Sequence, residues 1–407
     1  MSKMNIEEPQ SCFGCGNCVY ICSHNAIHIV SDEEGFYKSH VDEAKCVNCG
    51  LCTGVCPVLD VQSQNCNQED AFVQKYYAVR HKDPEIVKHS SSGGVFSGLA
   101  QKVLDDDGAV YGVCMNQNLS AVYSRATEYK DVELMRGSKY VQAYMPQGVI
   151  KSLLEDVRAK RKVLFSGTSC IISGMRKLFD YLSVSDETVC WVDLICSGVI
   201  SPEIINREVD RIERSCGSFV SGIDFRNKDT GWRDYSIKYL TDNNPIYNRF
   251  AASPIGIMLH MNDLKLSHCS SCEYHSFERI SDITLGDFWN NEFLPRSWDN
   301  DSGVSIAMIN SLKGYGFFCR TKKLEYLEVN RTAADSAQLH RSNVDSPMPL
   351  DANNTRQRTW NEIREDYDQF ISKHCRLNLV QSIVIYIIRP IIIKSRLLRC
   401  IRKIKKG

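Results

Sequence analysis

The sequence lacks several features that identify common classes of protein. Its 49 basic and 49 acidic residues give a formal net charge of zero, so it has no basic footprint for nucleic acid. Residues 1–10 show no positively charged stretch followed by an apolar one, and we therefore expect no export signal. With 43% hydrophobic and 24% charged residues, the composition is typical of a soluble globular chain, and we expect a cytoplasmic protein.

Cysteine, in contrast, is abundant, with 19 residues, and eight of them form two runs of identical spacing. In each run a cysteine recurs after two, two and three intervening residues; the second run starts 34 positions after the first and is followed by proline. Paired runs of this kind hold two [4Fe–4S] clusters, each run giving three thiolates to one cluster and the fourth to the other. We therefore expect one cluster on Cys12, Cys15, Cys18 and Cys56, and a second on Cys46, Cys49, Cys52 and Cys22.

A disulfide framework and a zinc site are two other interpretations of these cysteines. Disulfides are typical of exported chains, and no export signal is expected here. Structural zinc sites use four ligands and rarely pair two such runs. Ser23 stands where the first run would normally be followed by proline, which is one departure beside eight cysteines in register. Iron–sulfur is the favoured interpretation.

The spacing of apolar residues predicts two kinds of fold in one chain. Residues 26–30 and 36–41 read as a short hairpin between the two cysteine runs, and the polar segment 61–68, which contains Cys66, reads as a linker. Beyond it, strands alternate with helices, which favours a mixed or partly parallel sheet with helical cover. The expected strands are 75–80, 109–115, 121–125, 161–165, 188–195 and 281–286, with helices starting after Gly94 and at Pro202. The fold class is therefore α+β and α/β, with an N-terminal bacterial-type ferredoxin module.

Two motifs in the α/β part suggest ligand sites. The segment Ser91-Ser92-Gly93-Gly94 opens a helix, where free backbone N–H groups favour a phosphate, although such a start is more often only a helix cap. Four further cysteines form the second motif. Two of them end strands, where open α/β sheets place ligands, and the other two form a CxxC pair; from spacing alone, a third [4Fe–4S] site, a zinc site and unligated thiols all remain open. These four are Cys170, Cys196, Cys269 and Cys272.

A series of motifs in this order resembles the coenzyme F420 hydrogenase/dehydrogenase beta-subunit family, whose bacterial members commonly carry an N-terminal two-cluster ferredoxin. The motifs that carry the resemblance lie at 91–94, 136–142, 167–170, 196–202, 225–232, 269–272 and 282–289. The resemblance covers residues 1 to about 320. It implies an FAD and a [4Fe–4S] cluster in the main domain. Two motifs depart from the family: Ser169 replaces a usual proline, and Ser197 replaces a common histidine, which puts an unchanged substrate pocket in doubt.

The resemblance also assigns residues to these groups. It places the third cluster on Cys170, Cys196, Cys269 and Cys272, and it makes Ser92, Gly93 and Gly94 contacts of FAD. Lys139 becomes a candidate for contact with the flavin or an anionic substrate and a candidate catalytic residue, the alternative being a solvated loop lysine. Asp287 is assigned to orient flavin or cluster ligands, the alternative being a turn cap. Trp232 and Trp289 are expected to pack rather than stack on a ligand.

These expectations describe an iron–sulfur flavoprotein oxidoreductase. Electrons would move between the ferredoxin clusters and FAD to reduce or oxidise a small organic substrate, either F420-like or an intermediate of polysaccharide biosynthesis, because many bacterial members occur beside surface-polysaccharide genes. The alternative is a non-catalytic subunit that feeds electrons to a partner enzyme, so an electron donor or acceptor protein is an expected partner. The expected domains are 1–66 for the ferredoxin, 70–150 and 151–330 for the two parts of the family region, and 331–407 for a helical tail.

The C-terminal tail predicts contact with a membrane surface. After Asp368 it has ten basic residues and no acidic one, and its uncharged run 377–388 is shorter than the roughly 20 residues that span a bilayer. Pro390 should kink or break a helix there. Past it, Ile393, Leu397, Ile401 and Ile404 recur at helical spacing, the pattern of a helix on the anionic inner face of the cell membrane. The alternative is a helix docked on the protein itself or on a partner.

Overall fold

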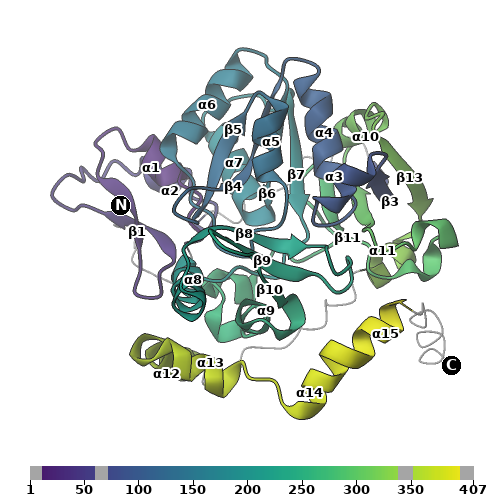
Figure 1. Ribbon diagram of the computed structural model, residues 1–407. Coiled ribbons are helices and arrows are strands. Elements are labelled where there is room, and N and C mark those ends of the chain that lie inside the picture. The colour runs from purple at the N-terminus through teal and green to yellow at the C-terminus, as the bar shows by residue number, and fades with distance from the viewer. Residues whose placement is uncertain (1–11, 60–71, 338–351, 395–407) are drawn as a thin grey trace.

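The computed structural model describes residues 12–59, 72–337 and 352–394 (Figure 1). The predicted linker 61–68 with Cys66 lies outside the described residues, as do Leu397, Ile401 and Ile404 of the tail. The described chain is a mixed α/β structure with a ferredoxin-like module at its N-terminal end, so the predicted fold class is confirmed.

The ferredoxin module consists of two cysteine loops joined by a hairpin. Strands β1 (Ile27–Ser31) and β2 (Tyr37–Val41) pair antiparallel, as predicted. Each cysteine run ends in a short helix, α1 (Asn17–Ile21) or α2 (Leu51–Gly54). Gly16 and Gly50 precede these helices with φ of 83° and 76°, a backbone region that glycine enters without the steric cost of a side chain. The loops can therefore turn sharply around a cluster.

The main domain is built on an eight-stranded mixed sheet in the order β13-β3-β12-β11-β7-β6-β4-β5. The four central strands β11, β7, β6 and β4 are parallel, and the flanking strands pair antiparallel. The strands are β3 (Lys75–His81), β4 (Ala109–Met115), β5 (Ala121–Ala126), β6 (Val163–Thr168), β7 (Val189–Leu194), β11 (Ile283–Asp287), β12 (Ser305–Ile309) and β13 (Leu324–Val329). Each of the six strands predicted from the sequence is present, with both ends within three residues of the prediction.

Helices cover both faces of this sheet because successive side chains of a strand point to opposite sides. On β4, Tyr111 joins a core shared with α6 (Gln147–Arg158), α7 (Ser169–Tyr181) and α8 (Pro202–Cys216). Its neighbour Val110 joins the opposite core, shared with α4 (Val95–Leu104), α5 (Tyr129–Met135) and α10 (Leu312–Cys319). Short helices α3 (Pro84–Lys88) and α9 (Pro254–Met258) lie between strands along the chain, and α11 (Arg331–Ala337) follows the last strand, β13. Helix α8 starts at Pro202, as predicted, and Ser201 caps it by accepting from the Glu203 backbone N–H.

A second, three-stranded antiparallel sheet lies beside the main one (Figure 1). It is formed by β8 (Val220–Asn227), β9 (Ser236–Thr241) and β10 (Ile246–Arg249). The C-terminal region, yellow in the figure, follows as α12 (Ala352–Glu365), α13 (Tyr367–His374), α14 (Leu379–Ile383) and α15 (Arg389–Lys394). Trp360 of α12 is buried against Phe36 of the ferredoxin hairpin, with ring centroids 6.3 Å apart. The tail thus contributes to holding the hairpin on the main domain.

Pro390 does not break the C-terminal helix, contrary to one part of the prediction. The five residues before α15, Val384–Ile388, form a π-helical turn, and helix continues through the proline. A wider turn relieves the clash between the proline ring and the carbonyl four residues earlier. Among the described residues no single helix is long and apolar enough to cross a membrane. Helix α13 and the helix 379–393 reach that length and apolar character only when taken together, and the two are bent by 82° relative to each other.

Candidate functional site

The predicted ligand residues of the main domain gather at one edge of the sheet. Strands β6, β7 and β11 are parallel neighbours, so their carboxyl ends meet at the same edge. Cys170 follows β6 in the first turn of α7, Cys196 follows β7, and Asp287 ends β11. This edge is where open α/β sheets usually bind ligands.

The four thiols of this edge lie close to one another. Burial, together with the neighbouring thiols of Cys196 and Cys272, raises the pKa of Cys170 to about 12. Burial also raises the pKa of Cys269, as do the nearby thiols of Cys196, Cys170 and Cys272. The structure therefore brings together Cys170, Cys196, Cys269 and Cys272, which are far apart in the sequence. We call these four side chains the cysteine quartet.

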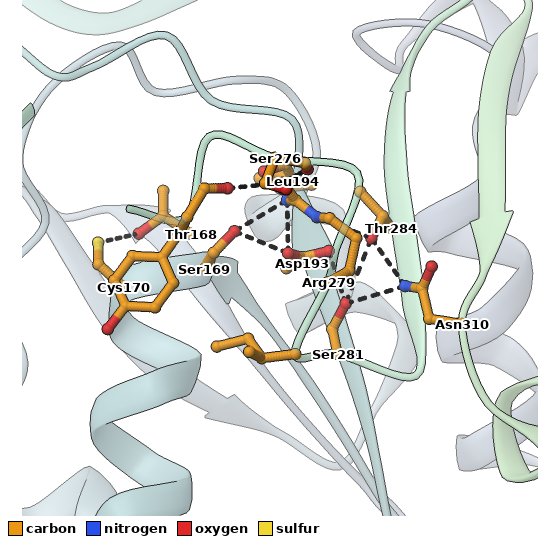
Figure 2. Close-up of polar contacts among 12 residues, drawn as sticks. Thr168, Ser169, Cys170, Asp193, Leu194, Ser276, Arg279, Ser281, Thr284 and Asn310 are labelled. Carbon is orange, nitrogen blue, oxygen red and sulfur yellow. Dashed lines mark hydrogen bonds and ion pairs between the residues drawn. The ribbon is translucent and has the colours of Figure 1, made fainter. Parts of the chain in front are cut away.

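A buried ion pair fixes the three segments that carry the quartet (Figure 2). Arg279, on the loop after Cys272, pairs with the fully buried Asp193 of β7 at 2.5 Å. Ser169, beside Cys170, donates to the same carboxylate at 2.7 Å and accepts from Arg279 at 2.8 Å. Because β7 leads to Cys196, this one network positions every part of the quartet. Arg279 and Asp193 were not found from the sequence, where no spacing signal connects them.

The ferredoxin module brings its own thiols together. Burial, together with the nearby thiols of Cys12 and Cys56, raises the pKa of Cys18 to about 12. The pKa of Cys15 is also raised, by burial and by the thiols of Cys18, Cys12 and Cys56. In the second run, burial raises the pKa of Cys52, with contributions from Cys49 and Cys46. Cys22 is placed by its sulfur accepting from the Ala26 backbone N–H at 3.3 Å.

These thiol groups have the ligand chemistry of iron–sulfur clusters. Within the described ranges, no three His, Cys, Asp or Glu side chains are arranged to hold one ion. A [4Fe–4S] cluster binds one thiolate at each of four irons and therefore spreads its ligands more widely than a single ion. Thiols with raised pKa values need a strongly positive centre before they lose their protons, and bound iron supplies one. The assignment of individual cysteines to clusters remains a prediction.

The segment 91–94 uses its polar groups within the protein. Ser92 donates to the Val304 carbonyl at 2.8 Å, and the Gly93 N–H donates to the Ser305 hydroxyl at 2.9 Å. A Cβ on Gly93 would lie 2.4 Å from the Val79 carbonyl oxygen, so close packing against β3 requires glycine there. Gly94 caps α4 with φ of 78°. The structure thus gives this segment a packing role, and its contact with FAD remains a prediction.

Lys139 is not the solvated loop lysine of the alternative interpretation. Its ammonium donates to the carbonyls of Leu134, Met135 and Arg136, which end α5, at 2.8–3.2 Å. Burial lowers the pKa of Lys139 to about 8. The side chain therefore closes the C-terminus of α5, where a cation also interacts favourably with the helix dipole.

Asp287 belongs to a group of aromatic and charged side chains. The sequence indicated Asp287, Trp232 and Trp289 but not Arg226. Arg226 of β8 forms a two-pronged pair with the Asp287 carboxylate, both distances being 3.1 Å, and the Trp232 indole N–H donates to it at 3.2 Å. Trp232 stacks on Trp289, with ring centroids 4.7 Å apart, so both pack as predicted. Arg226 also donates to the Ser91 carbonyl at 2.7 Å. The motifs at 91–94, 225–232 and 282–289 therefore meet around one buried guanidinium.

Arg226 is the functional candidate that sequence reasoning missed, although it lies inside a motif that had been singled out. It is 4% exposed, and its Nε is buried without a partner among the described residues. A cavity of about 430 Å³ lies at strands β9 and β10 and is lined by Arg211, Thr230, Ser236, Tyr247, Asn248, Arg249, Ala252, Pro254 and Tyr386. Arg211 is already paired with the buried Glu208, at 2.8 Å.

Known proteins resemble parts of the chain. The Methanocaldococcus jannaschii protein MJ1349 is 24% identical over 204 residues, which is 43% of this chain and 55% of that protein. A ferredoxin of the same organism, MJ0722, is 36% identical over 52 residues, 13% of this chain and 66% of its own length. The chain thus spans between half and two thirds of these relatives. A chain of the F420-reducing [NiFe] hydrogenase complex from Methanosarcina barkeri aligns with 74% of this chain and 97% of its own, at 19% identity and a TM-score of 0.43.

Family descriptions match three consecutive regions. Residues 11–59 match a 4Fe–4S dicluster domain. Residues 76–151 match the N-terminal region of the coenzyme F420 hydrogenase/dehydrogenase beta subunit, and residues 160–335 match its C-terminal region. The two latter regions together cover more than half of the chain, and they contain the cysteine quartet and the group around Arg226. The chain belongs to the coenzyme F420 hydrogenase/dehydrogenase beta-subunit family and carries a 4Fe–4S dicluster domain at its N-terminal end.

Proposed function

We propose that this chain is an FAD- and iron–sulfur-dependent oxidoreductase with three [4Fe–4S] clusters. The observation that carries the proposal is the cysteine quartet, whose four thiols meet at the ligand-binding edge of the sheet and are fixed by the Asp193–Arg279 pair. The ferredoxin module would hold two clusters, and the quartet would hold the third. Four thiolates in a shielded site are the usual ligand set of such a cluster.

FAD supplies the ability to exchange electrons singly with clusters and in pairs with an organic substrate. The residues proposed to contact it are Ser92, Gly93, Gly94, Lys139 and Asp287. Since Ser92, Gly93 and Lys139 make hydrogen bonds inside the protein, we propose that they shape the backbone around the flavin. Arg226 joins this set because its buried guanidinium ties segment 91–94 to Asp287. The proposed substrate is a small organic molecule, either F420-like or an intermediate of polysaccharide biosynthesis.

Cofactor analysis tests this proposal. After anaerobic reconstitution we expect about twelve irons and one flavin per chain, because each cluster contains four irons. The double variant Cys269→Ser, Cys272→Ser should hold about eight irons, the content of the ferredoxin module alone. Equal iron content near eight in the parent and in the variant would refute the third cluster. A reconstituted parent with full iron and no flavin would refute the FAD site.

A non-catalytic electron-transfer subunit is the second candidate function. The observation that favours it is the internal use of Ser92, Gly93 and Lys139, which leaves few polar groups of the predicted set to bind a flavin or substrate. The two functions differ in one measurement. Purified protein that reduces an organic acceptor in the presence of a chemical electron donor supports the enzyme. Electron transfer that requires a second protein supports the subunit.

We also propose peripheral contact between the C-terminal helix and an anionic membrane. Along 379–391 the side chains of Leu379, Val380, Tyr386, Ile387 and Ile391 are more than half exposed, although all are apolar or aromatic. Arg389 holds this helix to the main domain through the Arg233 carbonyl, at 2.8 Å. Exposed apolar residues followed by a basic segment fit a helix lying in the headgroup region.

Vesicle flotation tests the membrane contact. The full chain should float with anionic vesicles, weakly with neutral ones, and a chain ending at Arg376 should float with neither. Equal flotation of both chains, or none, would refute the contact. Flotation of the full chain only in the presence of a second protein would assign the helix to a protein partner.

A further inference from the structure

The ferredoxin module contacts the main domain at α7, the helix whose first turn contains Cys170 of the quartet. The Asn17 side chain donates to the Gly174 carbonyl of α7 at 2.6 Å and to the Val55 carbonyl at 3.2 Å. Asn17 is fully buried, so this contact excludes water. A Cβ built on Gly174 would lie 2.9 Å from the Cys15 Cβ and 3.3 Å from its sulfur. The first cysteine loop therefore rests directly on the α7 backbone.

Gly174 lies one helical turn from the quartet. Cys170 is in the first turn of α7, and four residues of helix rise about 6 Å. A second contact runs in parallel: the ring of Phe13, beside Cys12, lies 4.9 Å from the ring of His268, beside Cys269. Asn17, beside Cys18, therefore contacts the helix of Cys170, and Phe13, beside Cys12, packs near His268, beside Cys269.

The other ferredoxin thiols include a more exposed one. Cys49 is exposed, and Val47, beside Cys46, is 56% exposed, whereas Phe13 and Asn17 are buried against the main domain. Cys22, Cys46 and Cys52 are half-buried. We call Cys12, Cys15, Cys18 and Cys56 the enclosed set, because Cys15 packs against α7, and the other four the exposed set, after Cys49.

We propose that Gly174 is the positioning residue that lets electrons pass between the set Cys12, Cys15, Cys18 and Cys56 and the cysteine quartet. The inference rests on the proposed function and adds an order to it. The exposed set would hold the cluster that takes one electron from an external donor, and the enclosed set and the quartet would hold the clusters that receive this electron in turn. In each step one cluster is oxidised and its neighbour is reduced by a single electron, and no bond is made or broken.

Glycine is otherwise a poor choice at this position. It is less favourable than alanine inside a helix, and Gly174 is the sixth residue of the thirteen in α7. Any side chain there would push Cys15 away from the helix. Because electron transfer falls steeply with distance, the close approach that only glycine permits would maintain the rate.

The test uses the full reconstituted chain with graded substitutions, Gly174→Ala and Gly174→Val. Gly316 of α10 provides the matched control, because it is also inside a helix and a Cβ there would meet only the end of the Arg320 side chain, at 3.8 Å. Iron content, flavin content and thermal unfolding establish that each variant is folded and loaded. Two readouts then follow: the rate at which dithionite-reduced clusters pass electrons to the flavin, and the magnetic coupling between clusters by electron paramagnetic resonance.

To identify the coupled set, the resonance is recorded in a Cys49→Ser background, which leaves the enclosed set in the module. We expect Gly174→Val to slow electron transfer several-fold, because a larger separation between the two cysteine sets lowers the transfer rate, and to weaken the coupling. Gly174→Ala should have a smaller effect, and the Gly316 variants none. Unchanged rate and coupling in a fully loaded Gly174→Val variant would overturn the inference alone. A parent with only eight irons would overturn the proposed function, and this inference with it.

Discussion

The ferredoxin module and the cysteine quartet hold thiols in different ways. In the module, all eight cysteines lie between Cys12 and Cys56, and short loops with positive-φ glycines bring them together. The quartet is drawn from three distant segments, and the buried Asp193–Arg279 pair joins them. The comparison teaches that a local site depends on its loops and its metal, whereas a non-local site depends on the sheet that carries it.

Removal of iron should separate the two regions most strongly. The module has few buried apolar side chains of its own, namely Phe13, Ala26, Ile27, Phe36 and Val55. Its cysteine loops should therefore unfold when iron is chelated, as in other small metal-dependent domains, while the eight-stranded sheet keeps its two cores. Hydrogen exchange measured after chelation should show loss of protection at 12–25 and 42–59 first. Simultaneous loss of protection in β6 and β7 would contradict the difference between the regions.

Substitution of Arg279 should damage the quartet and spare the module. Arg279→Ala leaves the fully buried Asp193 carboxylate without its cation, a change that typically costs about 3–5 kcal/mol. We expect lower thermal stability and loss of about four irons per chain, the content of one cluster. Lys130→Ala is the matched control, because it removes only an exposed pair with Glu128, which solvent screens. Full iron content in Arg279→Ala would show that the thiols are held without the ion pair.

The sequence predicted the module and the sheet well because both have local signals. Spacing identifies the eight cysteines, and short continuous apolar runs identify strands such as β4 and β7. The Asp193–Arg279 pair and the contact of Asn17 with Gly174 were not predicted, because each joins residues far apart in the chain. The alternative interpretation of Lys139 as a solvated loop lysine differs from the structure, in which three carbonyls at the end of α5 accept from its ammonium. The loop position in the sequence gives no sign of these contacts.

A substitution of Cys49 should affect one cluster without disturbing the main domain. Cys49 is exposed and lies outside the quartet, so Cys49→Ser should lose about four irons and retain the quartet iron and the flavin. Iron and flavin analysis measure both quantities. Thermal unfolding of the main sheet should change little. Loss of flavin together with this iron would show that the two regions fold as one unit.

The smallest effect is expected at Gln142, which joins the two regions by hydrogen bonds. This buried side chain accepts from the Tyr37 N–H at 2.7 Å and donates to the carbonyls of Tyr37 and Phe13, at 3.0 and 3.3 Å. Gln142→Leu removes these bonds and leaves the Tyr37 N–H unpaired at the interface. Unsatisfied buried groups cost about 1–3 kcal/mol each, so the variant should unfold at a lower temperature with its iron still bound.

Gln147 supplies the control for this last variant. It also reaches the module, donating to the Val19 carbonyl, but the contact is exposed and 3.5 Å long. Gln147→Leu should therefore leave the unfolding temperature nearly unchanged, because water replaces an exposed hydrogen bond at little cost. Proteolysis of the module, compared between the two variants, locates the effect: only Gln142→Leu should expose the hairpin β1–β2. Equal behaviour of both variants would mean that apolar packing around Phe36 and Trp360, rather than hydrogen bonding, holds the module on the main domain.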